Sequence, residues 1–219
     1  DLGGLDLNIT QGEMNQINKY KKDVDGVTGK NTPNVTQYGL VHLDGTQATT
    51  YARIRKLSGD DFKRASRQRI VLQAMLEKAK KANPATLVKI CNSVVDDIST
   101  TLSLDQMVSL AKDVTKYKIS STTGFPTDLT TKNMPRCGDT VIPADLVTNV
   151  KKLHEYMFDD AAYTPSQTVQ AISETIVNTT GITADSAKIN TSDYNETVGA
   201  TGTDEIQKGS ETTGGTNVQ

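Results

Sequence analysis

The chain has 219 residues, enough for one domain with a sizeable core, and a net charge of −2. Its sequence pI is about 5.7 and only 5% of its residues are aromatic, which argues against nucleic-acid binding. No apolar run approaches the roughly 20 residues that span a bilayer, and no signal peptide is visible. Charge is uneven, because residues 177–219 hold two lysines and six acids while the rest is mildly basic.

Local patterns predict an alternation of helices and strands. Capping boxes, in which a Glu or Gln follows three residues after a Ser, Thr or Asp, predict three helix starts, at Thr10–Glu13, Asp44–Gln47 and Ser103–Gln106. Apolar residues at helical spacing predict further helices over 61–81, from Asn83-Pro84, over 144–158 and from Thr164-Pro165. We expect short strands at 5–9 and 117–121, an extended segment at 53–55, and loops at 22–37 and 122–140.

Helices placed between few strands predict a layered α/β domain. Residues 179–219 differ from the rest, because Thr, Gly, Asn and Ser dominate there without any period. We predict that this tail is disordered and that removing residues 181–219 leaves the melting temperature unchanged.

Arginines are concentrated in one stretch. Of the six in the chain, five lie between residues 53 and 69: Arg53, Arg55, Arg64, Arg67 and Arg69. The planar guanidinium matches the paired oxygens of a phosphate or carboxylate and stays charged when partly buried. The cluster therefore predicts an anion-binding site.

Spacing arranges these residues on two faces. Arg53 and Arg55 are two apart, so an extended segment points both to one side. On the helix that follows, Asp61, Arg64 and Gln68 share a narrow face. The same face continues with Leu72, Met75, Leu76 and Ala79. We therefore expect the polar trio to face the core, either to bind a ligand or as a structural Asp61–Arg64 ion pair with Arg53 and Arg55 solvated.

Two segments closely resemble the LytR-CpsA-Psr family. One runs from Gly39 to Arg55 and ends in Tyr51-Ala-Arg-Ile-Arg55, and the other is Asp61-Phe-Lys-Arg-Ala-Ser-Arg-Gln68. Two weaker marks agree, namely Gly3-Gly-Leu-Asp-Leu7 and Val141-Ile-Pro-Ala-Asp-Leu-Val-Thr-Asn-Val150. The resemblance covers roughly residues 1–160.

The resemblance implies an extracytoplasmic, membrane-anchored phosphotransferase of mainly Gram-positive bacteria. Such proteins move a glycopolymer, such as teichoic acid or capsular polysaccharide, from a polyprenyl-pyrophosphate carrier to peptidoglycan, with Mg²⁺ as cofactor. By matching position, Arg53, Arg55, Arg64 and Gln68 are expected to contact the pyrophosphate. Arg67 is a candidate secondary contact and Asp61 the acidic, catalytic member of the site.

The position of the motifs implies an N-terminally truncated domain. Residues 1–160 are expected to be the C-terminal portion of the family domain, 161–178 a terminal helix, and 179–219 the tail. The metal-binding aspartates and the membrane anchor are then expected upstream. We therefore expect no Mg²⁺ ligand within this chain and no activity from the chain alone.

Other interpretations of the chain's function and of its histidines and cysteines remain open. The chain could be a non-catalytic module that binds polyprenyl phosphates or wall polymers, while nucleic acid is the least favoured partner. His42 and His154 lack the spacing of a zinc site. Cys91 and Cys137 would either form a disulfide or be two buried thiols.

Overall fold

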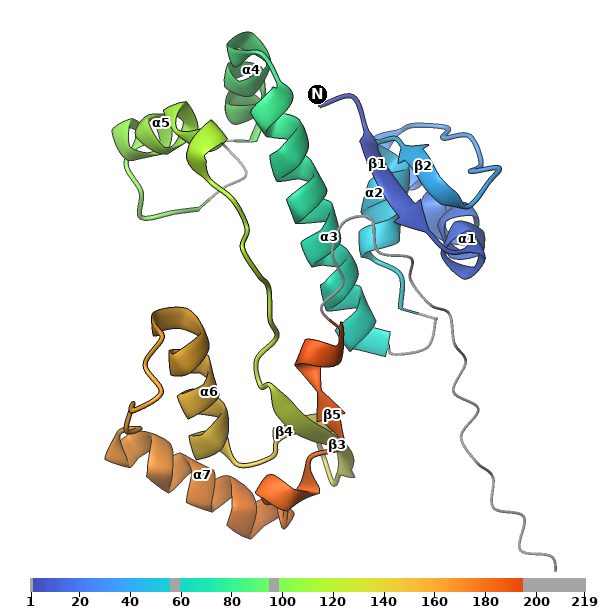
Figure 1. Ribbon diagram of the computed structural model, residues 1–219. Coiled ribbons are helices and arrows are strands. Elements are labelled where there is room, and N and C mark those ends of the chain that lie inside the picture. The colour runs from blue at the N-terminus through green and yellow to red at the C-terminus, as the bar shows by residue number, and fades with distance from the viewer. Residues whose placement is uncertain (1, 56–59, 95–98, 195–219) are drawn as a thin grey trace, which may run out of the picture.

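The computed structural model describes residues 2–55, 60–94 and 99–194 (Figure 1). Its strands are β1 (Leu5–Ile9), β2 (Gly39–Leu43), β3 (Asp128–Met134), β4 (Gly138–Pro143) and β5 (Ile189–Asn190). Its α-helices are α1 (Gln11–Thr28), α2 (Gly45–Ala52), α3 (Asp60–Lys81), α4 (Pro84–Val94), α5 (Leu104–Lys112), α6 (Leu146–Phe158) and α7 (Gln167–Thr180). Short 3₁₀ helices are η2 (Val114–Lys116), η3 (Ala184–Ser186) and η4 (Thr191–Tyr194). The α/β prediction is thus confirmed.

The core of the N-terminal part is built on one face of a two-stranded sheet. β1 and β2 pair antiparallel, from Leu5 opposite Leu43 to Ile9 opposite Gly39. Leu5, Leu7 and Ile9 are buried because alternate residues of a strand share a face. Residues of α1, α2 and α3 complete the same cluster, among them Ile17, Tyr51 and Ile70. Figure 1 shows α3 running through the middle of the molecule beside these elements.

All three predicted capping boxes form. Thr10 Oγ1 accepts from the Glu13 backbone N–H at 3.1 Å, and Glu13 Oε2 accepts from the Thr10 N–H at 3.0 Å. Asp44 and Gln47 make the same reciprocal pair, as do Ser103 and Gln106.

The loop predicted at 22–37 is wrong in its first part. α1 continues to Thr28 and ends at Gly29, which caps it in the left-handed conformation with φ of 67°. The loop that follows is tied back to the helix, since Asp25 accepts from both the hydroxyl and the backbone N–H of Thr32. Asn18 likewise pairs with the backbone of Val35.

The predicted core-facing side of α3 is also wrong. Leu72 and Met75 are 59% and 41% exposed. The buried residues are Ser66, Arg67, Ile70 and Ala74. At about 100° per residue, Ser66, Ile70 and Ala74 point well away from Gln68, whereas Arg67 lies about 60° from Arg64. Apolar residues occur on both sides of α3, so periodicity predicted a helix there but not which side the core would cover.

The C-terminal part contains a hairpin that the sequence did not predict. No strand forms at 117–121, and the expected loop at 122–140 instead contains β3 and the start of β4. These two strands pair antiparallel, from Leu129 opposite Pro143 to Met134 opposite Gly138. β3 is mostly polar and its apolar and polar residues do not alternate, so its sequence lacks the pattern that predicts a strand. Buried Asn149 of α6 bonds both the N–H and the carbonyl of Asp128, each at 2.9 Å.

The disordered tail was predicted to begin too early. α7 runs to Thr180, and β5 then pairs with β3 through Asn190 and Ile189. Thr191 is buried and its hydroxyl donates to the Gly124 carbonyl at 3.0 Å. Residues 179–194 are therefore ordered against β3, and 195–219 lie outside the described residues. The domain boundaries at 160 and 178 stay predictions.

Candidate functional site

Residues 53–55 carry two exposed arginines on a firmly held backbone. They follow the end of α2 and form no strand, contrary to the predicted extended segment. Arg53 and Arg55 are exposed, while Ile54 between them is 3% exposed and belongs to the core. The Arg53 N–H donates to the Thr50 carbonyl at 3.0 Å, and the Ile54 N–H to the Tyr51 carbonyl at 3.2 Å. Both guanidinium groups are therefore presented from a fixed segment.

Arg67 differs from these arginines because it is buried, with 4% of its surface exposed. Its Nε lies 2.7 Å from Glu13 Oε1, which forms a buried ion pair between α3 and α1. Its Nη1 donates to the Ile54 carbonyl at 3.4 Å. The sequence predicted Arg67 as a candidate secondary pyrophosphate contact, but in the structure its guanidinium contacts Glu13 and the Ile54 carbonyl.

Arg64 and Gln68 lie one helical turn apart on α3, so they share a face. Gln68 is exposed and Arg64 half-buried. An ion pair with Asp61 was one interpretation of Arg64 and is not tested, whereas the described residues show a buried pair between Arg67 and Glu13. The side chain of Asp61, together with residues 56–59, lies outside the described residues. Its role stays a prediction.

Glu13, which contacts Arg67, and Asp44, which caps α2, do not fit Mg²⁺. Mg²⁺ needs one or two carboxylates free to join the substrate phosphates. Glu13 is buried and already accepts from Arg67 and Thr10, and Asp44 accepts from the Gln47 N–H. Within residues 2–55, 60–94 and 99–194, no group of three or more His, Cys, Asp or Glu could hold a metal ion.

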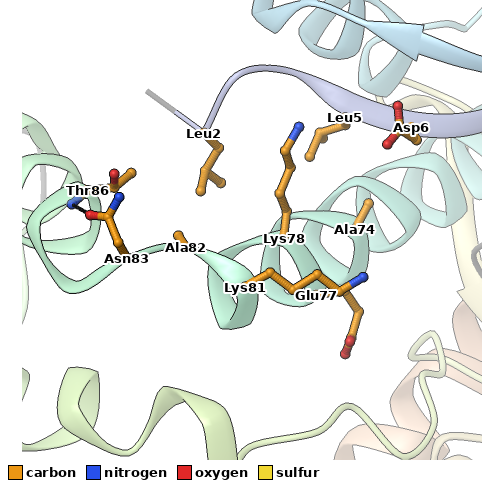
Figure 2. Close-up of a pocket in the computed structure, with 10 residues that line it drawn as sticks. All are labelled: Leu2, Leu5, Asp6, Ala74, Glu77, Lys78, Lys81, Ala82, Asn83 and Thr86. Carbon is orange, nitrogen blue, oxygen red and sulfur yellow. Dashed lines mark hydrogen bonds between the residues drawn. The ribbon is translucent and has the colours of Figure 1, made fainter.

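Two of the cavities in the described part of the chain border α3, away from the arginine pair. One, of about 550 Å³, separates Leu2, Leu5 and Asp6 from the C-terminal half of α3. Figure 2 shows Lys78 reaching from α3 toward the chain above it, where its Nζ donates to the Gly4 carbonyl at 2.7 Å. The other, of about 630 Å³, lies between α3 and the C-terminal sheet and includes Arg69. The residues proposed to contact pyrophosphate, namely Arg53, Arg55, Arg64 and Gln68, line neither cavity.

The histidine and cysteine predictions have mixed outcomes. His42 is on the surface, where its Nδ1 lies 2.7 Å from Asp6 Oδ1 and lowers the pKa of that carboxyl. The ring of His154 stacks on Tyr163. Cys137 is an exposed free thiol, so it is neither buried nor part of a disulfide. The side chain of Cys91 lies outside the described residues.

The described residues form an α/β protein whose segment after α2 carries two exposed arginines, Arg53 and Arg55. The model of the LytR_cpsA_psr family matches residues 1–134, more than half of the chain, and the chain belongs to that family. The match extends from β1 to the end of β3 and contains the whole arginine cluster. A search of curated proteins found no match.

Membership places the chain in a coarse functional class. Proteins of this family are associated with the cell envelope and are generally transferases that act on cell-wall polymers. No helix in the described part of the chain is long and apolar enough to cross a membrane.

Proposed function

We propose that this chain carries the pyrophosphate-binding residues of a cell-wall glycopolymer transferase. Arg53, Arg55, Arg64 and Gln68 contact the pyrophosphate of a polyprenyl-linked glycopolymer, and peptidoglycan is the acceptor. The observation that carries the proposal is the pair of exposed arginines on either side of the anchored Ile54. An extracytoplasmic location, a membrane anchor and a Mg²⁺ requirement belong to the same proposal.

The chemistry explains why arginines suit this position. An acceptor hydroxyl attacks the phosphorus that bears the glycopolymer, and the bond from that phosphorus to the bridging oxygen breaks. Polyprenyl phosphate leaves with the bonding electron pair, and the hydroxyl proton passes to that departing phosphate. Negative charge grows on the departing oxygens, and fixed cationic donors stabilise it. Each guanidinium can hold two oxygens at once, which an ammonium cannot.

The direct test is titration of the chain with farnesyl pyrophosphate. Arg53→Lys and Arg55→Lys keep the charge but lose the two-pronged hydrogen bond. We expect each to weaken binding roughly tenfold, since a hydrogen bond to a charged group is worth about 1.5–3 kcal/mol. Arg136→Lys, an exposed arginine in the β3–β4 turn, is the matched control and should bind as wild type does. Unchanged affinity in both site variants would refute the proposal.

Asp61 is proposed as the acidic, catalytic member of the site, where it orients Arg64. Asp61→Asn should then reduce affinity for the pyrophosphate with little change in melting temperature. If the residue instead forms a structural pair, the same variant should melt at a lower temperature and bind normally. Thermal melts and titration of this one variant separate the two roles.

A binding module without turnover is the second candidate. The hydrogen bonds of Glu13 with Arg67 and Thr10 favour this second function, because they leave the Glu13 carboxylate unable to bind a metal ion. A glycopolymer transfer assay with and without Mg²⁺ distinguishes the two functions. Because this chain alone is expected to be inactive, the assay is run both on it and on a version extended at its N-terminus. Binding without Mg²⁺-dependent turnover in both supports the module, and turnover in either supports the transferase.

A further inference from the structure

A series of hydrogen bonds, called the relay below, links the start of α1 to the segment that carries the two exposed arginines. Thr10 starts it at the beginning of α1, where its backbone N–H donates to Glu13 Oε2. Glu13 Oε1 accepts from Arg67 Nε, and Arg67 Nη1 donates to the Ile54 carbonyl. The relay therefore connects α1, α3 and the segment that follows α2.

Ile54 is held at three points. Its side chain lies in the core, its N–H donates to the Tyr51 carbonyl, and its carbonyl accepts from Arg67. The first two points also depend on α2 and the core cluster. The third contact is made by the Arg67 side chain alone, and other residues must hold that side chain in place.

We propose that Glu13 and Arg67 are positioning residues that fix the spacing of Arg53 and Arg55 for a pyrophosphate. This inference rests on the proposed function of the same site. Arg67 does not touch the ligand. It holds the carbonyl between the two binding arginines, and Glu13 holds the guanidinium that does so.

Arginine is needed at position 67 for geometric reasons. Its fork reaches Glu13 with Nε and the Ile54 carbonyl with Nη1 at the same time. A lysine places one nitrogen at one point, so it can keep the ion pair but lose the carbonyl. Burial makes Glu13 necessary in turn, since a buried guanidinium without a carboxylate is strongly disfavoured.

The test compares binding, stability and backbone protection in one set of variants. Arg67→Lys is the main variant, and Glu13→Asp is the second, which keeps the carboxylate but shortens its reach. Ile17→Val removes one methylene from a fully buried residue of α1 and is the control for lost stability alone. Arg53→Lys reports on the proposed function. Farnesyl pyrophosphate is the probe, and amide hydrogen exchange at residues 53–55 is read without ligand.

We expect Arg67→Lys and Glu13→Asp to weaken binding by about tenfold or more, because small misplacements of binding groups are costly. Exchange at residues 53–55 should speed up in both. Ile17→Val should bind as wild type does despite its lower melting temperature. Two outcomes would overturn the positioning role but not the proposed function. One is that Ile17→Val weakens binding as much as Arg67→Lys does. The other is that Arg67→Lys binds as wild type does while Arg53→Lys binds weakly. Wild-type affinity in Arg53→Lys and Arg55→Lys would refute the proposed function and this inference with it.

Discussion

The ring of Phe62 on α3 stacks on the ring of Tyr194 in η4, with centroids 5.8 Å apart and planes inclined by 30°. Arg69, two turns along the same helix, donates from Nη2 to the Tyr194 carbonyl at 3.2 Å. Burial also lowers the pKa of the Arg69 guanidinium. The helix that carries Arg64 and Gln68 is thus tied to a residue beyond the family match, which ends at residue 134.

The Phe62–Tyr194 contact should contribute a measurable coupling energy. Phe62→Ala, Tyr194→Ala and the double variant form a mutant cycle, analysed by urea unfolding. We expect a coupling of about 0.5–1.5 kcal/mol, the usual worth of an aromatic pair beyond its buried area. Additive losses would mean that the two rings do not stabilise each other in solution.

Truncation separates the ordered C-terminal segment from the residues after it. Removing 181–219 deletes β5, buried Thr191 and Tyr194, so we expect a lower melting temperature, at roughly 2–4 °C per kcal/mol lost. Removing 195–219 keeps each of those contacts and should leave the melting temperature unchanged. Equal melting temperatures for the two truncated chains would show that β5 adds no stability.

Breaking the buried ion pair should destabilise the fold strongly. Glu13→Ala leaves Arg67 charged and buried without its carboxylate, and we expect a loss of about 3–5 kcal/mol in the free energy of unfolding. Replacing both partners, as Glu13→Leu with Arg67→Met, should cost much less, because no charge then remains buried. Urea unfolding measures both. A double variant as unstable as the single one would contradict this account.

Acid should weaken the anchor between α1 and its following loop. Hydrogen bonds from the Thr32 hydroxyl and N–H hold the pKa of Asp25 below its ordinary value of 3.8. A lowered pKa in the folded state stabilises the fold above 3.8, and this contribution is lost as the pH falls through the lowered value. Wild type should therefore exceed Asp25→Asn in melting temperature at neutral pH, and the gap should close in acid. A constant gap would exclude this origin.

The sequence by itself determined those features that depend on near neighbours. Thr10 and Glu13 are three residues apart, so their capping box needs no other part of the chain. Alternation placed Leu5, Leu7 and Ile9 on one buried face of β1. The family followed from motifs that are contiguous in the chain. The same motifs predicted Arg53 and Arg55 as pyrophosphate contacts, and the binding tests proposed above address that prediction.

Only the tertiary structure decided which side of α3 faces the core and what Arg67 contacts. Both sides of the helix carry apolar residues, so the covering elements selected Ile70 and Ala74 over Leu72 and Met75. Glu13 meets Arg67 across 54 residues of sequence, a distance over which spacing holds no information. The polar strand β3 likewise forms because β4, β5 and Asn149 satisfy its backbone. Long-range partners are chosen by the packing of whole elements, and no local pattern encodes that choice.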